Sequence, residues 1–177
     1  MKPQRSILFT LFVVLAAASM VAKNTPETLK FDMGKEGEWK LAATSGAPGG
    51  GTIMEFVREG DDVAHWKELV TMQDFRKSSA VKSPDATLEK LKVLHEKRCP
   101  GATEWNIIDK TEDNVLYEWH QKPCANQPEQ SELVRVLYGK QNVFFLHYAV
   151  KSHDFPPEAR TEWIKRFNEA AIIPGEK

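Results

Sequence analysis

The sequence lacks the motifs by which most enzymes are recognised. It contains no G-x-S-x-G elbow, no H-x-x-x-H or H-x-H spacing, and no glycine-rich loop with the lysine of a phosphate-binding site. Basic clusters are also absent, and the chain carries 24 basic against 25 acidic side chains. This near-neutral balance argues against nucleic acid as a partner and against an anionic membrane surface.

Cysteine is scarce, because Cys99 and Cys124 are the only two in the chain. Their spacing is neither C-x-x-C nor a zinc pattern. A single pair in a small exported domain typically forms a disulfide, so we expect a structural Cys99–Cys124 bridge worth about 3–4 kcal/mol in the chain-entropy description. A redox pair and a pair of metal ligands stay open as alternatives.

Long hydrophobic runs are absent except for residues 7–18, which follow the basic Lys2 and Arg5. This run is shorter than the roughly 20 apolar residues that span a bilayer, and small residues follow it. The pattern predicts a signal peptide over residues 1–22 and export to the periplasm or the extracellular space. No cysteine follows the run to carry a lipid, so we expect no stable membrane anchor.

Beyond the signal, we expect an irregular N-terminal arm over residues 23–38 and a single α+β domain over residues 39–177. Neither an internal repeat nor a low-complexity segment divides the chain. Alternation and turn residues predict strands, and helical spacing with capping residues predicts helices. The expected strands are 39–44, 52–58, 68–75, 103–109, 114–121, 132–138 and 142–151, and the expected helices are 83–98, a last helix from 156 to 174 and a short piece after 59–62.

The strands over 132–138 and 142–151 carry apolar residues on both faces, which indicates burial on both faces. The first helix presents Leu88, Leu91 and Leu94 as an apolar stripe. We therefore expect an antiparallel sheet of about six or seven strands with helices packed on its faces, an α/β/α sandwich-like fold.

The segment from Glu55 to Thr71 contains the pattern E-G-x-x-V-x-x-W between two strands, followed by L-x-T. It resembles a pattern in small exported bacterial proteins of uncharacterised function with a Mog1/PsbP-like architecture. The resemblance implies a sheet between helices, a strand meander and a final helix. The better-known relatives are accessory or binding proteins without a catalytic centre, and no functional residue is carried over.

Three side chains are candidates for acid–base chemistry. Glu118 and His120 project from one face of their strand, because side chains alternate with period two. His147 lies on a strand that could run nearby, and a carboxylate that orients an imidazole supports proton transfer. The alternative is that all three are ordinary polar residues on a half-exposed sheet. No metal ligand set or cofactor is predicted.

These features favour an exported, non-catalytic binding or accessory protein whose partner is an unknown protein or small ligand. A second hypothesis is a small hydrolase or isomerase that uses Glu118 and His120. A third is a structural homodimer joined through an exposed edge strand or an apolar sheet face.

Overall fold

The computed structural model describes residues 25–35, 37–47, 50–77 and 83–175. The predicted signal peptide, residues 1–22, lies outside the described residues. Within the described part of the chain, neither helix has the length and apolar character needed to cross a bilayer.

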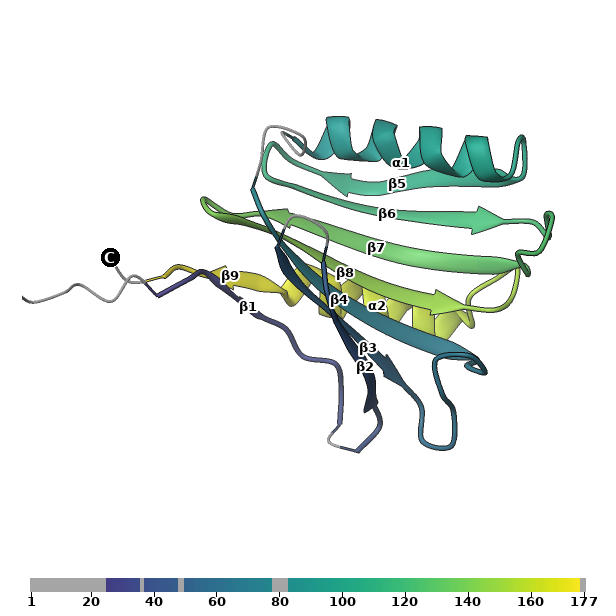
Figure 1. The fold of residues 1–177 in the computed structure, drawn as a ribbon, viewed down its shortest axis with the longest axis horizontal. Coiled ribbons are helices and arrows are strands. Elements are labelled where there is room, and N and C mark those ends of the chain that lie inside the picture. Colours follow the sequence, from purple (N-terminus) through teal and green to yellow (C-terminus); the bar gives the residue numbers. More distant parts are fainter. Residues whose placement is uncertain (1–24, 36, 48–49, 78–82, 176–177) are drawn as a thin grey trace, which may run out of the picture.

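A seven-stranded antiparallel sheet forms the centre of the molecule (Figure 1). The strand order is β2-β3-β4-β8-β7-β6-β5, and every neighbouring pair is antiparallel. The predicted antiparallel sheet and its strand number are confirmed. The strands are β2 (Lys40–Gly46), β3 (Gly51–Val57), β4 (Glu68–Arg76), β5 (Thr103–Lys110), β6 (Asn114–Gln121), β7 (Gln130–Tyr138) and β8 (Asn142–Val150).

The long connection after β4 decides this order. Helix α1 (Pro84–Arg98) carries the chain to the far edge of the sheet, where β5 begins. The meander β5–β6–β7–β8 then returns strand by strand until β8 pairs with β4. The last strand of the chain's meander is therefore central and lies between β4 and β7.

Helix α2 (Pro157–Glu169) covers one face of the sheet and lies behind it in Figure 1. Its buried Trp163 and Phe167 pack on apolar residues of the central strands. The Trp163 ring stacks on Tyr148 of β8 with centroids 4.5 Å apart. This face, the α2 face below, holds the larger of the two apolar clusters.

In the described part of the chain, helix α1 covers the opposite face, the free face below, at its β5 end. Helix α1 runs beside β5 along the edge of the sheet (Figure 1) and buries residues of its first turns, including Leu88. Leu94 of the same helix is 50% exposed, so the predicted apolar stripe is wrong there. The reason is that the side of α1 facing the sheet carries Leu88, Leu91 and His95, and Leu94 lies about 100° around the helix from His95. Among the described residues, no helix covers the free face over β3 and β4.

Three further differences from the sequence expectations lie in the connections. The expected irregular arm contains β1 (Thr28–Lys30), which pairs with β9 (Ala171–Ile173) in a second, two-stranded sheet. Helix α2 therefore ends at Glu169 and not at Pro174. The expected helical piece after residues 59–62 is also wrong, because this stretch forms turns and bends. Asp62 caps those turns and does not start a helix.

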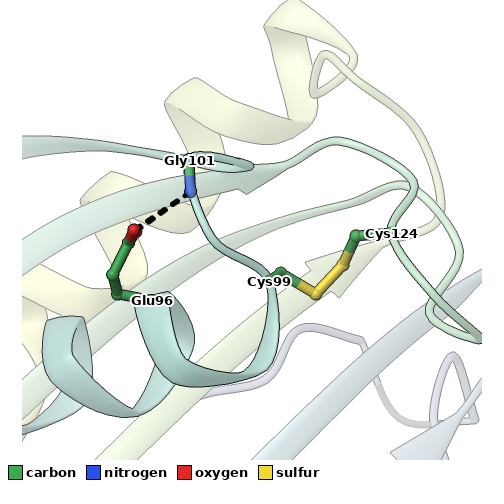
Figure 2. The surroundings of a disulfide bond; sticks show 4 residues. All are labelled: Glu96, Cys99, Gly101 and Cys124. Carbon is green, nitrogen blue, oxygen red and sulfur yellow. Dashed lines mark hydrogen bonds between the residues drawn. A yellow bond between two sulfur atoms is a disulfide. The ribbon is translucent and has the colours of Figure 1, made fainter.

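The predicted disulfide is confirmed (Figure 2). Cys99 is the C-cap residue of α1, and Cys124 lies in the loop between β6 and β7, with 5.8 Å between the two Cα atoms. Glu96 accepts a hydrogen bond from Gly101 N and closes the turn after the helix. The bridge ties the C-terminal end of α1 to the β6–β7 loop, and neither thiol is left to act as a metal ligand.

Candidate binding groove and histidine cluster

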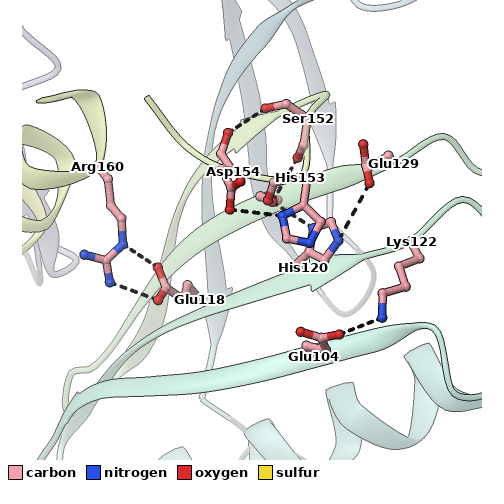
Figure 3. Close-up of polar contacts among 10 residues, drawn as sticks. Glu104, Glu118, His120, Lys122, Glu129, Ser152, His153, Asp154 and Arg160 are labelled. Carbon is pink, nitrogen blue, oxygen red and sulfur yellow. Dashed lines mark hydrogen bonds and ion pairs between the residues drawn. The ribbon is translucent and has the colours of Figure 1, made fainter. Parts of the chain in front are cut away.

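Glu118 of β6 is engaged in a structural ion pair. Arg160 of α2 binds both of its carboxylate oxygens, at 2.8 and 2.9 Å (Figure 3). Asn106 of β5 donates a third bond to the carboxylate at 2.8 Å. Burial alone raises the pKa of Glu118, but the bonds from Arg160 and Asn106 outweigh it and hold this pKa below its usual value. The carboxylate ties the sheet to α2 and is not directed at His120.

His120 lies on the same face as Glu118, as the strand alternation predicted. Its Nδ1 is 3.0 Å from Ser131 Oγ, and its ring centroid is 3.9 Å from that of His153 (Figure 3). Burial, followed by the proximity of His153, lowers the pKa of His120. A cavity of about 320 Å³ adjoins these residues. The imidazole is thus oriented by a hydroxyl and not by the expected carboxylate.

His147 does not join the other two candidates, and this part of the prediction is wrong. Its neighbours Leu146 and Tyr148 belong to the core beneath α2, so alternation directs His147 to the free face. Glu118 and His120 project to the α2 face. The sheet itself therefore separates His147 from the proposed pair.

The carboxylate that orients His147 is Glu132 of β7. His147 Nδ1 donates to Glu132 Oε1, and the two side chains are 18% and 12% exposed. Gln130 Nε2 donates to the second carboxylate oxygen at 3.1 Å. His147 Nε2 is buried and has no partner among the described residues. It is an acceptor when Nδ1 carries the proton.

A polar row crosses the free face beside this pair. The register places Glu55 of β3 opposite Thr71 of β4, and Thr71 opposite His147 of β8. Neighbouring strands lie about 4.8 Å apart, so these side chains form a continuous line on one face. Polar groups of this kind on a partly buried surface require partners, which a bound molecule can supply.

This row is the floor of a groove of about 600 Å³, the free-face groove below. One wall is α1, which directs Leu91, His95 and Arg98 into the groove at helical spacing. Aromatic residues of β6 and β8 form the apolar part of the floor, while glutamine side chains line the end near the disulfide and the β4 side. Concave sites with an apolar floor and a few convergent polar groups are the usual form of ligand sites.

His95 adds a second imidazole to the wall. Its ring contacts Trp105 and Trp119 edge-on, with centroids 5.1 and 4.6 Å apart. Burial lowers the pKa of His95, so the ring is neutral at pH 7. Its Nδ1 is buried without a partner among the described residues.

The sequence contained a signal for the Glu132–His147 pair. The short turn after Tyr138 sets the register of β7 and β8, which places Val134 opposite His147. Glu132 shares a face with Val134, two residues away, so it is diagonal to the imidazole. The predicted carboxylate for His147 was Glu118 of β6, whereas its partner is Glu132 across the β7–β8 hairpin.

The described residues contain no group of three or more histidine, cysteine or acidic side chains arranged to hold a metal ion. No family model matches this chain, and no curated protein matches it.

Proposed function

We propose that this chain is an exported binding protein without catalytic activity, and that it holds a small ligand in the free-face groove. The observation that carries the proposal is the Glu132–His147 pair in the groove floor, with His147 Nε2 unpartnered. A buried polar atom without a partner costs about 1–3 kcal/mol, which a bound ligand can recover.

The location of the groove supports a binding role. Its floor is a sheet whose opposite face is packed against α2, and its wall, α1, is fastened at one end by the Cys99–Cys124 bridge. Such a floor is preorganised, so the protein loses little conformational entropy when a ligand binds. We also propose that the chain is related to the Mog1/PsbP-like exported proteins. This relationship would agree with a binding role, since their better-known members are accessory or binding proteins.

The hydrolase or isomerase hypothesis draws less support. Glu118 is bound at both oxygens by Arg160, and it shares no hydrogen bond with His120 among the described contacts. The homodimer hypothesis is tested by light scattering coupled to size-exclusion chromatography, where a mass of one chain rejects it.

The experiment that tests the binding proposal is a fragment screen by ¹H–¹⁵N correlation NMR on the processed protein. We expect a set of fragments to shift amide signals of β4, β7, β8 and α1 around the groove. Gln73→Trp fills the groove and should abolish these shifts, whereas Gln141→Trp, at an exposed turn outside it, should preserve them. Fragments that shift only residues outside the groove, or that bind Gln73→Trp as well as wild type, refute the proposal.

A further inference from the structure

The chemistry of the groove lining restricts what the ligand can be. We propose that the free-face groove binds a neutral saccharide, a short oligosaccharide with several free hydroxyl groups. This inference rests on the proposed function and specifies the ligand class for that site.

The charges of the groove are nearly balanced. Glu55 and Glu132 contribute negative charge, and Arg98 contributes positive charge from the wall. Glu132 is already bonded to His147 and to Gln130, so it is not a free anionic site. An anionic ligand would meet no excess of positive charge here and would lose its hydration without compensation. A polycation would meet an excess of a single negative charge, with Arg98 on the wall to repel it.

The hydrogen-bonding groups of the groove are mostly ones that both donate and accept. Four of its lining residues are glutamines, namely Gln73, Gln121, Gln127 and Gln130. A primary amide offers an acceptor oxygen beside a donor nitrogen. His95 Nδ1 and His147 Nε2, which have no partner among the described residues, add two further hydrogen-bonding atoms. Hydroxyl groups also donate and accept, so vicinal hydroxyls of a sugar complement this lining.

A purely apolar ligand fits the same lining poorly. It would remove water from the amides and from the Glu132–His147 pair and give no hydrogen bond in return. A buried polar group left without a partner is destabilising, and several such groups outweigh the gain from a small apolar contact.

The apolar part of the floor matches the remaining surface of a sugar ring. Trp119 and Phe145 lie in the floor and are each 8% exposed, and the half-buried Trp105 and Phe75 beside them offer more ring surface. Phe75 meets Phe145 edge-on, with the ring centroids 5.5 Å apart. Aromatic faces and edges pack against the C–H groups of a pyranose while its hydroxyls reach the surrounding amides. The volume of about 600 Å³ lies in the range of sites that bury drug-sized ligands.

The test is an NMR titration with defined probes. Maltotriose, cellotriose, mannotriose and N-acetylchitotriose represent neutral saccharides, while palmitate represents an anionic apolar ligand and spermidine a cation. We expect at least one saccharide to saturate the shifts of the groove amides at millimolar concentration, and neither palmitate nor spermidine to do so.

The variants are Gln73→Leu and Gln130→Leu, which retain most of the side-chain volume, with Gln141→Leu as the matched control outside the groove. Loss of one good hydrogen bond should weaken saccharide binding about tenfold in each groove variant and leave the control unchanged. The correlation spectrum of each variant shows directly whether it is folded.

The outcomes separate the two proposals. If palmitate or spermidine saturates the groove and no saccharide does, the saccharide inference is overturned while the binding function stands. If no saccharide binds, or if saccharides shift only residues elsewhere, the inference is also overturned. The fragment screen then decides independently whether the groove binds any ligand.

Discussion

Glu27 links the beginning of the described chain to the β7–β8 turn. Its carboxylate accepts hydrogen bonds from the backbone N–H groups of Lys140 at 2.7 Å, Gln141 at 2.8 Å and Asn142 at 3.0 Å. The residue is 7% exposed. It accepts from three backbone donors of the tight turn that sets the β7–β8 register and so places His147 in the groove floor.

Glu27→Gln keeps the size of the side chain and removes its charge. One oxygen becomes an NH₂ group that faces a backbone donor, so at least one N–H loses its acceptor. A bond to a charged group contributes about 1.5–3 kcal/mol, and we expect a loss of about 2 kcal/mol of unfolding free energy at pH 7. For a domain of this size, that loss lowers Tm by about 4–8 °C.

The effect should depend on pH. Burial raises the pKa of Glu27, but the three backbone bonds and Lys140 outweigh it, so this pKa is lowered in the folded protein. A carboxylate with a lowered folded pKa stabilises fully above its unfolded pKa, and the stabilisation is lost as the pH falls through the folded pKa. The difference between wild type and Glu27→Gln should therefore be full at pH 7 and shrink below about pH 4.3.

The assay is urea unfolding followed by tryptophan fluorescence between pH 3 and pH 7, with the exposed turn variant Glu59→Gln as control. Gly139→Ala perturbs the same contact independently, because a methyl group there would overlap the Glu27 carboxylate. Equal urea midpoints for Glu27→Gln and Glu59→Gln at pH 7 would refute the reasoning. So would a difference that does not shrink in acid.

Three further outcomes follow from the contacts described above. Replacing both Cys99 and Cys124 by serine should lower the unfolding free energy by about 3.5 kcal/mol in the chain-entropy description, measured by urea unfolding, and an unchanged midpoint would contradict this. Tyr138→Phe removes the hydroxyl that donates to Ser83 O at 2.9 Å and should cost about 1–2 kcal/mol, with faster amide exchange in the first turns of α1 as its specific signature. A double-mutant cycle of Glu118→Gln and Arg160→Gln should give a coupling free energy of about 1 kcal/mol at pH 7, because Arg160 is 38% exposed and solvent weakens the pair. The pKa of Glu118 is lowered in the folded protein, so this coupling should fade as the pH drops through that pKa. A coupling of zero at pH 7 would reject the ion pair as a stabilising contact.

The candidate site was partly predictable because local rules operate over short distances. Strand alternation correctly placed Glu118 and His120 on one face. It failed for His147, because the long β6–β7 loop leaves the register of β6 relative to β7 and β8 undetermined by the sequence. A shift of one residue in this register moves a side chain to the other face of the sheet. Across the short β7–β8 turn the register was determined, so the Glu132–His147 pair was within reach of the sequence.

The sequence by itself determined the seven strands of the central sheet, the existence and start of both helices, the two-sided burial of the central strands and the cysteine pairing, because alternation, caps and a single pair of thiols leave few alternatives. Only the tertiary structure decided which faces the helices cover. Helix α1 lies beside β5 along the edge of the sheet, and this long-range placement exposes the groove. It also decided that β1 and β9 pair, since strands of three residues gain stability only from a partner distant in the chain.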